Sequence, residues 1–143
     1  MVEIVRDQDN LIAGWVCRGV NEKIENLGGY LVTLGFQQGR KLVGGLIYHG
    51  ISANELFLTI YTTAPAWCTR KILNFCFSFA FEALKVRRIS LLISRSNVKS
   101  LDFCTRLGFQ IEGIKRQARD NGEDVFFLGM LKSECKFLRS DKK

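Results

Sequence analysis

The sequence predicts a single mixed α/β domain. Apolar runs with strand character alternate with segments of helical periodicity, which is the pattern of a sheet covered by helices. The length of 143 residues suits one domain with one substantial core. Hydrophobic residues make up 47% and aromatic residues 11%, so the chain is globular and not disordered. We therefore expect residues 1–143 to form one unit.

A strand, turn and helix between Ile89 and Gly108 form the most informative stretch. Ile89–Ile93 is an apolar strand, and Asn97 lies where a short polar side chain can cap the following helix. Gly108 is placed to end that helix with a positive φ. The helix itself is indicated by apolar residues at helical spacing, namely Leu101, Cys104 and Leu107.

The remaining elements follow from similar patterns. Helical periodicity interrupted by glycine predicts one or two short helices over Leu11–Leu27, and a longer helix is expected after Pro65, through Leu84. Gly44 and Gly45 lie inside a strand, which indicates a bulge or a close backbone approach. The other predicted strands are Val2–Val5, Tyr30–Phe36, Lys41–Tyr48, Leu56–Thr62, Phe109–Gln117 and Val125–Leu131.

Charge and cysteine content limit the classes of function. A net charge of +7 suits an anionic partner such as cofactor phosphates, nucleic acid or the ribosome, although a solvated basic surface without a partner is equally compatible. Five cysteines without CxxC spacing indicate reduced core thiols in a cytoplasmic protein. With one histidine, a metal site or Ser-His-Asp catalysis is not expected. Neither a signal peptide nor a membrane span is indicated.

The order of motifs from Pro65 to Leu138 resembles the GNAT superfamily of N-acetyltransferases. The resemblance is carried by Asn97-x-x-Ser100, a helix, the segment Arg106–Phe109 and the pair Glu112-Gly113. The continuation is similar to the branch that acetylates ribosomal-protein N-termini and small amines, through Phe109–Arg116, Asp120, Gly122, Asp124 and Gly129-Met130. This resemblance implies a mostly antiparallel twisted sheet with a splayed central parallel pair and helices on both faces.

The resemblance also implies acetyl-CoA as the acetyl donor and an amine as the acceptor. The coenzyme A pyrophosphate would lie at the helix start after Pro65, where Thr69, Arg70 and Lys71 occupy the first turn. Both glycines of the family's phosphate loop are missing, and its leading basic residue is Cys68. Arg70 and Lys71 can supply the charge, or they can simply face solvent.

Further site residues are implied by the same resemblance. Backbone N–H groups of the strand Leu56–Thr62, at Ile60 and Thr62, would bind the acyl group, and Asn97 would hold the pantetheine arm. Many family members place a catalytic tyrosine where this chain has Cys104, so we expect Ser100 to serve the leaving thiolate instead. A plain capping-turn serine is the alternative. The general base stays open among Glu55, Glu112, His49 and a water chain, with His49 expected to be exposed at its strand end.

Two classes of function therefore remain. The first is an acetyl-CoA-dependent N-acetyltransferase acting on a protein N-terminus or a small amine. The second is a catalytically degenerate member of the same fold that uses its basic surface to bind nucleic acid or the ribosome. The sequence leaves the acceptor open and is compatible with a monomer or a homodimer. We expect none of the cysteines to act as a nucleophile, and Cys68 is the one exception that the sequence allows, because a thiol at a helix start beside Arg70 can have a lowered pKa.

Overall fold

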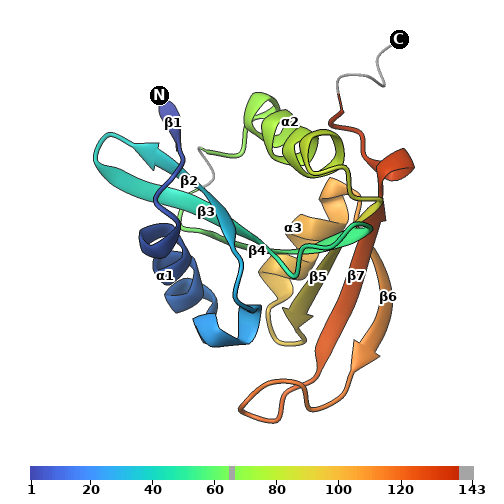
Figure 1. The fold of residues 1–143 in the computed structure, drawn as a ribbon. Coiled ribbons are helices and arrows are strands. Elements are labelled where there is room, and N and C mark those ends of the chain that lie inside the picture. Colours follow the sequence, from blue (N-terminus) through green and yellow to red (C-terminus); the bar gives the residue numbers. More distant parts are fainter. Residues whose placement is uncertain (65–66, 139–143) are drawn as a thin grey trace.

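The fold is an α/β sandwich built on one twisted sheet (Figure 1). The structure is a computed structural model that describes residues 1–64 and 67–138. The predicted strand end at Pro65 and the tail Arg139–Lys143, which the sequence predicts to fray, lie outside the described residues. The strands are β1 (Val2–Val5), β2 (Val32–Gln38), β3 (Lys41–His49), β4 (Glu55–Thr62), β5 (Arg88–Ser94), β6 (Gln110–Lys115) and β7 (Val125–Leu131). The helices are α1 (Asp9–Val20), α2 (Arg70–Ser78) and α3 (Val98–Leu107).

The sheet has the strand order β1-β2-β3-β4-β5-β7-β6. Neighbouring strands are antiparallel except β4 and β5, which run parallel. This parallel pair is joined over only three residue pairs, from Glu55 opposite Arg88 to Phe57 opposite Ser90. Beyond that point the two strands diverge. The prediction of a mostly antiparallel sheet with a splayed central parallel pair is therefore confirmed.

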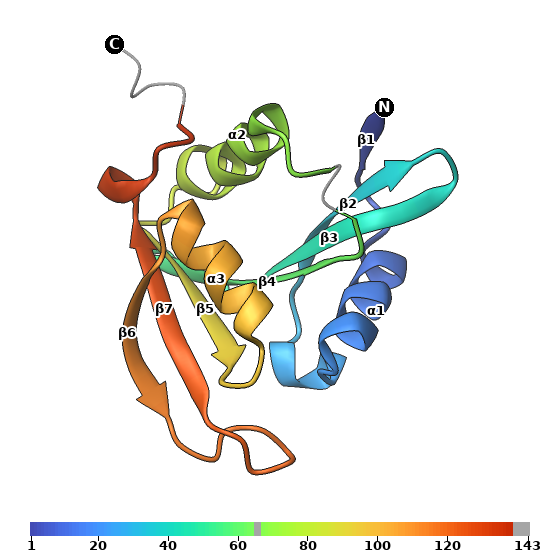
Figure 2. The ribbon, with the colours of Figure 1, turned by 180° about the vertical axis from the view of Figure 1, so that it is seen from behind.

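Helices cover both faces of the sheet, as predicted (Figure 2). The side chains of β3 pack on both faces, because successive side chains of a strand point to opposite sides of the sheet. Leu46 and Tyr48 pack in the large core with α2 and α3, whereas Ile47 packs in a smaller cluster with α1. The short helical turn Ile24–Leu27 follows α1, which agrees with the prediction of two short helices in this region.

The two glycines of β3 allow close approaches, as the sequence predicts. A Cβ on Gly44 would lie 2.7 Å from the Trp67 ring, and a Cβ on Gly45 would lie 2.8 Å from a methyl group of Val16. Trp67 is 1% exposed and stacks on Phe36, with ring centroids 4.6 Å apart. Gly44 thus allows a tryptophan from the chain between β4 and α2 to lie flat against the sheet.

The helix predicted through Leu84 changes its pitch after Ser78. The segment Phe79–Ala83 is a π-turn, in which the N–H of Leu84 donates to the carbonyl of Phe79. At the junction, the hydroxyl of Tyr48 donates to the carbonyl of Cys76 at 2.7 Å. A side chain that binds a helix carbonyl disturbs the regular ladder, which accounts for the wider turn at this place.

Candidate active site

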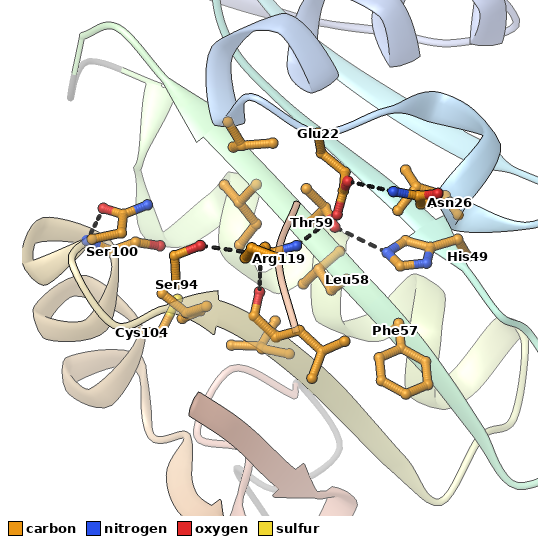
Figure 3. A pocket seen from close by; sticks show the side chains of 17 residues that line it. Glu22, Asn26, His49, Phe57, Leu58, Thr59, Ser94, Ser100, Cys104 and Arg119 are labelled. Atoms are coloured by element: carbon orange, nitrogen blue, oxygen red, sulfur yellow. Dashed lines mark hydrogen bonds and ion pairs between the residues drawn. The ribbon is translucent and has the colours of Figure 1, made fainter. Parts of the chain in front are cut away.

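The point where β4 and β5 diverge contains a cavity of about 110 Å³ (Figure 3). Its lining residues come from both faces of the sheet, from the α1 side and from the α3 side. The lining residues that matter for chemistry are Glu22, His49, Thr59, Ser94 and Arg119 on the α1 side and Ile60, Asn97, Ser100 and Cys104 on the α3 side.

The start of α3 supplies the two predicted catalytic residues. Asn97 precedes the helix, and its Oδ1 accepts a hydrogen bond from the Ser100 N–H at 3.2 Å. The predicted cap is therefore confirmed, as is the helix stop, because Gly108 has a φ of 118°. Asn97 is exposed and Ser100 is half-buried, and both line the cavity. The structure thus brings together the two residues for which we expect catalytic roles.

Cys104 lies one helical turn beyond Ser100 and belongs to the core. Its side chain is 2% exposed, and burial raises the pKa of its thiol to about 12, although a hydrogen bond with the Ser100 side chain partly opposes this. A thiol with this pKa stays protonated at neutral pH. Of the two candidates for the group beside the leaving sulfur, Ser100 therefore presents the better hydrogen-bond donor.

His49 lines the opposite wall, and the expectation that it is exposed was wrong. The residue is 9% exposed, stacks near Phe57 with centroids 5.9 Å apart, and has Nε2 2.9 Å from Thr59 Oγ1. Burial lowers the pKa of His49 to about 4, and the Glu22 carboxylate only partly opposes this shift. Pairing of β3 with β4 places Phe57 directly opposite His49 and covers the ring. The imidazole is therefore neutral at pH 7.

Glu22 and Arg119 form an ion pair across the cavity wall (Figure 3). Arg119 Nη1 lies 2.6 Å from Glu22 Oε2, while Nε donates to Ser94 Oγ at 2.8 Å and Nη2 to the carbonyl of Leu92 at 3.3 Å. The other oxygen of Glu22 accepts from Asn26 Nδ2 at 2.9 Å. The pair joins the segment after α1 to the loop between β6 and β7. Sequence reasoning missed both residues, because 97 positions separate them and neither carries a local motif.

Two of the candidate general bases lie elsewhere. Glu55 and Glu112 are absent from the cavity wall and both contact Arg88, at 3.6 Å and 2.6 Å. Arg88 also donates to Ser90 Oγ at 3.0 Å. Of the three side chains considered for this role, only His49 borders the cavity.

The three residues predicted to bind the cofactor at the start of α2 make different contacts. Thr69 caps the helix, since its hydroxyl accepts from the Ile72 N–H at 3.2 Å. Arg70 turns away, with Nη2 donating to the carbonyl of Lys136 at 2.9 Å and its guanidinium over the Phe137 ring. Lys71 is exposed in the first turn. The free first-turn N–H groups and Lys71 can bind a phosphate, so this end of α2 fits an anionic group.

The two strand residues assigned to the cofactor differ in position. Ile60 lines the cavity on a part of β4 that has left β5, so the edge of β4 that faces the gap is free of β5 pairing there. Thr62 is not part of the wall. Its hydroxyl donates to the carbonyl of Val43 at 3.1 Å and accepts from the indole N–H of Trp67. Thr62 therefore anchors Trp67, and its backbone is the part that can face a ligand.

All five cysteines are free, as predicted. The pKa of Cys68, the one thiol for which the sequence allowed a fall, is instead raised by partial burial. Cys17, Cys76 and Cys104 show the same direction, with burial as the main cause. These shifts keep the thiols protonated and disfavour nucleophilic chemistry.

Neither a metal centre nor a membrane helix is found in the part of the chain that the structure describes. Within residues 1–64 and 67–138, no group of three or more His, Cys, Asp or Glu side chains is placed to hold a metal ion. Over the same residues, no helix is long and apolar enough to cross a membrane.

A cavity lies at the splayed parallel pair and is bordered by the capped start of α3. The sequence model described as the acetyltransferase (GNAT) domain matches residues 34–126. The chain belongs to the GNAT acetyltransferase domain family. That match includes the splayed strands, α2 and α3.

Solved structures agree with this fold. A mutant of the spermidine N-acetyltransferase SpeG from Vibrio cholerae matches with a TM-score of 0.70 and 16% identity, covering 99% of this chain and 98% of that one. A chimera of SpeG from Vibrio cholerae and hSSAT matches with a TM-score of 0.68 and 14% identity, covering 92% and 96%. No curated protein matches the sequence. At these identities the structural likeness establishes the fold alone.

Proposed function

We propose that the protein transfers the acetyl group of acetyl-CoA to a primary amine. One observation carries the proposal: where β4 leaves β5, the cavity is lined by residues from both faces of the sheet. An acetyl donor on the α3 side and an amine on the α1 side can therefore meet within it. The wall on the donor side contains Asn97 and Ser100, and the wall on the acceptor side contains His49 and Thr59.

The reaction forms a bond between the amine nitrogen and the acetyl carbon and breaks the bond between that carbon and sulfur. Backbone N–H groups of β4 beyond Phe57 are placed to hydrogen-bond the acyl oxygen, since this edge is free of β5 pairing. The Ser100 hydroxyl is the donor for the sulfur as it takes up negative charge. Asn97 Nδ2 can hold the amide-bearing arm of the substrate, because Oδ1 is occupied by the helix cap.

The amine must also lose a proton, since a lysine-like ammonium has a pKa of ~10.4. A histidine with a pKa of about 4 is too weak a base to hold that proton at neutral pH. His49 therefore acts as a neutral hydrogen-bonding group, and the proton leaves through water. This role adds no positive charge to the wall that an ammonium approaches.

Isothermal titration with acetyl-CoA tests the donor half of this proposal. We expect saturable binding with one site per chain, and coenzyme A, which lacks only the acetyl group, serves as the comparison for the acyl contacts. Absence of detectable binding at millimolar acetyl-CoA would contradict the enzymatic function. The placement in the branch that acts on ribosomal-protein N-termini rests on the motif resemblance, and assays with N-terminal peptides test it separately.

A non-catalytic role is the second candidate, and two observations favour it. Cys104 occupies the place of the family's tyrosine and is sealed in the core, and the phosphate loop lacks its glycines. The net charge of +7 then supports nucleic-acid or ribosome binding. Gel-shift titrations at rising salt test this, because phosphate contacts weaken steeply as salt increases. Salt-independent or absent binding would remove it.

A further inference from the structure

The cavity wall carries a carboxylate, Glu22, whose charge is neutralised by Arg119. Of the described residues that line it, Glu22 is the only carboxylate, and it is paired with Arg119 at 2.6 Å. Both side chains are largely buried, with 17% and 25% exposure, so water screens the pair weakly. Arg119 is also held by Ser94 and the Leu92 carbonyl, which keeps it beside Glu22. An entering ammonium therefore meets no unpaired carboxylate in the cavity.

Apolar side chains form about half of the cavity wall. Neutral His49 adds no charge. The apolar lining comes from the end of α1, from the turn after it and from both diverging strands: Val20, Leu27, Phe57, Leu58, Ile60, Leu91, Leu92 and Ile93. A cavity of about 110 Å³ is small compared with the ~300–1,000 Å³ of sites that enclose drug-sized ligands. It suits a small amine with an apolar body.

An open groove of about 690 Å³ lies outside the Glu22–Arg119 pair and shares that pair with the cavity. Its lining contains three carboxylates, Glu22, Asp120 and Glu123, and two cations, Lys23 and Arg119. Lys23 pairs with Asp120 at 3.2 Å. The groove thus has an excess of one negative charge, and it is the charge of Glu123.

The ionised form of Glu123 is stabilised mainly by neutral hydrogen-bond donors, with a smaller contribution from Arg119. The Ser96 N–H donates to Oε1 at 2.7 Å and Asn121 Nδ2 to Oε2 at 3.3 Å. These hydrogen bonds, those from Ser96 foremost, lower the pKa of Glu123 below its usual value. A single anionic group beside the entrance attracts a cation and steers it toward the cavity.

We infer that the acceptor is a small primary amine with one positive charge and an apolar body, and that Arg119 determines this specificity by neutralising Glu22. The inference rests on the proposed acetyl transfer. A polyamine brings several ammonium groups, finds one unbalanced carboxylate in the groove, and faces the guanidinium of Arg119 at the cavity wall. Desolvating the remaining ammonium groups without partners is costly.

Competing amines test the inference on the full chain. The probes are 2-phenylethylamine, which has one ammonium and an apolar body, and spermidine, with product measured by mass spectrometry at saturating acetyl-CoA. We expect kcat/KM for 2-phenylethylamine to exceed that for spermidine by about tenfold or more, the range that a few well-placed contacts give. In Arg119→Gln, which frees the Glu22 carboxylate, this ratio should fall toward one. Arg116→Gln is the matched control, since Arg116 is an exposed arginine that lines neither cavity nor groove.

Each outcome decides the question. A wild-type preference for spermidine, or equal ratios in Arg119→Gln and Arg116→Gln, overturns the inference. If acetyl-CoA binds and neither amine is acetylated, the acceptor class is wrong while the donor half of the proposed function stands. If acetyl-CoA does not bind, the proposed function itself fails. Circular dichroism shows whether Arg119→Gln folds. If it does not, the wild-type ratio of the two amines alone supports or overturns the acceptor class. Glu22→Gln then replaces Arg119→Gln as the variant, and we expect it to keep the preference for 2-phenylethylamine.

Discussion

The two ends of the β4–β5 pair use the same strands in opposite ways. At the closed end, backbone pairing runs from Glu55 to Phe57, and Arg88 contacts Glu55, Ser90 and Glu112 across the strands. At the open end that pairing is absent, and Arg119 joins the segment after α1 to β5 through side-chain and carbonyl contacts. At each end, therefore, the guanidinium of one arginine links neighbouring segments. The closed end fixes where the strands part, and the open end contains the cavity.

The closed end depends on a glycine as well as on ion pairs. Gly129 of β7 lies under the Arg88–Glu112 pair, and a Cβ there would collide with both side chains. The glycine therefore lets an ion pair cross the sheet surface from β5 to β6. At the open end, the contacts come from loops that are distant in sequence. Variants at each end distinguish the two contributions.

The largest expected effect is on the pH dependence of stability at the open end. The pKa of His49 is about 4 in the folded protein, below the ~6.5 of an unfolded chain, so the unfolded state binds more protons between these values. Stability is therefore fully present above pH 6.5 and is lost as the pH falls toward 4, by about 3 kcal/mol. Denaturant unfolding of wild type and His49→Gln at pH 7 and pH 4 measures this.

The variant separates His49 from other acid-sensitive groups. His49→Gln cannot take up the extra proton, so its stability deficit relative to wild type should shrink by about that amount at pH 4. Glu22 is the charged group that acts on His49, and it is present in both proteins. An unchanged deficit between the two pH values would show that His49 is exposed to solvent.

Ser100→Ala tests the donor side of the open end. Loss of the hydroxyl should lower kcat on the order of 10²-fold while acetyl-CoA affinity stays nearly unchanged, since the bond to sulfur strengthens only as the thiolate leaves. Thr105→Ala, an exposed position further along α3, is the control and should keep turnover. Full activity in Ser100→Ala would show that Ser100 has no catalytic role and is only a residue of the capping turn.

Cys104→Ala completes the comparison on α3. The buried thiol should contribute packing and no chemistry, so we expect a stability loss of roughly 1 kcal/mol with turnover retained. Thermal unfolding and steady-state rates of the two variants are measured together. A catalytic loss in Cys104→Ala with an active Ser100→Ala would reverse the assignment and remove the basis for the ribosomal-protein-like branch.

Arg88→Met tests the closed end. The substitution keeps much of the side-chain volume but leaves Glu55 and Glu112 without their cation, so we expect a loss of about 1–2 kcal/mol in unfolding free energy. Arg95→Met is the control, because Arg95 is exposed and pairs with Asp124 at 3.5 Å, and such pairs contribute under ~1 kcal/mol. Equal losses would mean that the Arg88 cluster does not hold the strands together.

Sequence patterns predicted what depends on neighbours along the chain. Strand periodicity placed β1 and β7 at their observed bounds, and the cap at Asn97 and the stop at Gly108 follow from single residues. The ion pair of Glu22 and Arg119 depends on the folded arrangement of distant loops, so no local signal reveals it. Burial of His49 likewise arises from Phe57 on the next strand.

The contacts of Arg70 and Lys71 could not be predicted from the local sequence either. Changes at these residues have the smallest expected effect, a change in acetyl-CoA affinity. As adjacent basic residues at a helix start they look equivalent in sequence, yet Arg70 binds the Lys136 carbonyl while Lys71 is exposed at the first turn. A charge near a helix N-terminus contributes ~0.3–1 kcal/mol, so reversing Lys71 should weaken acetyl-CoA binding several-fold. Reversing the charges of Arg70 and Lys71 together should weaken binding further.

The single and double variants separate charge from structure. Lys71→Glu should leave stability within ~0.5 kcal/mol of wild type, as for other surface changes. Arg70→Glu removes the bond to Lys136 and the contact with the Phe137 ring, so it should lower stability more and affinity less than Lys71→Glu. Lys132→Glu, on the exposed turn after β7, controls for net charge. Titration calorimetry at two salt concentrations shows whether Lys71 contacts the cofactor phosphates, because a direct phosphate contact must weaken as salt rises. Equal affinities in Lys71→Glu and Lys132→Glu would place the phosphates away from the start of α2.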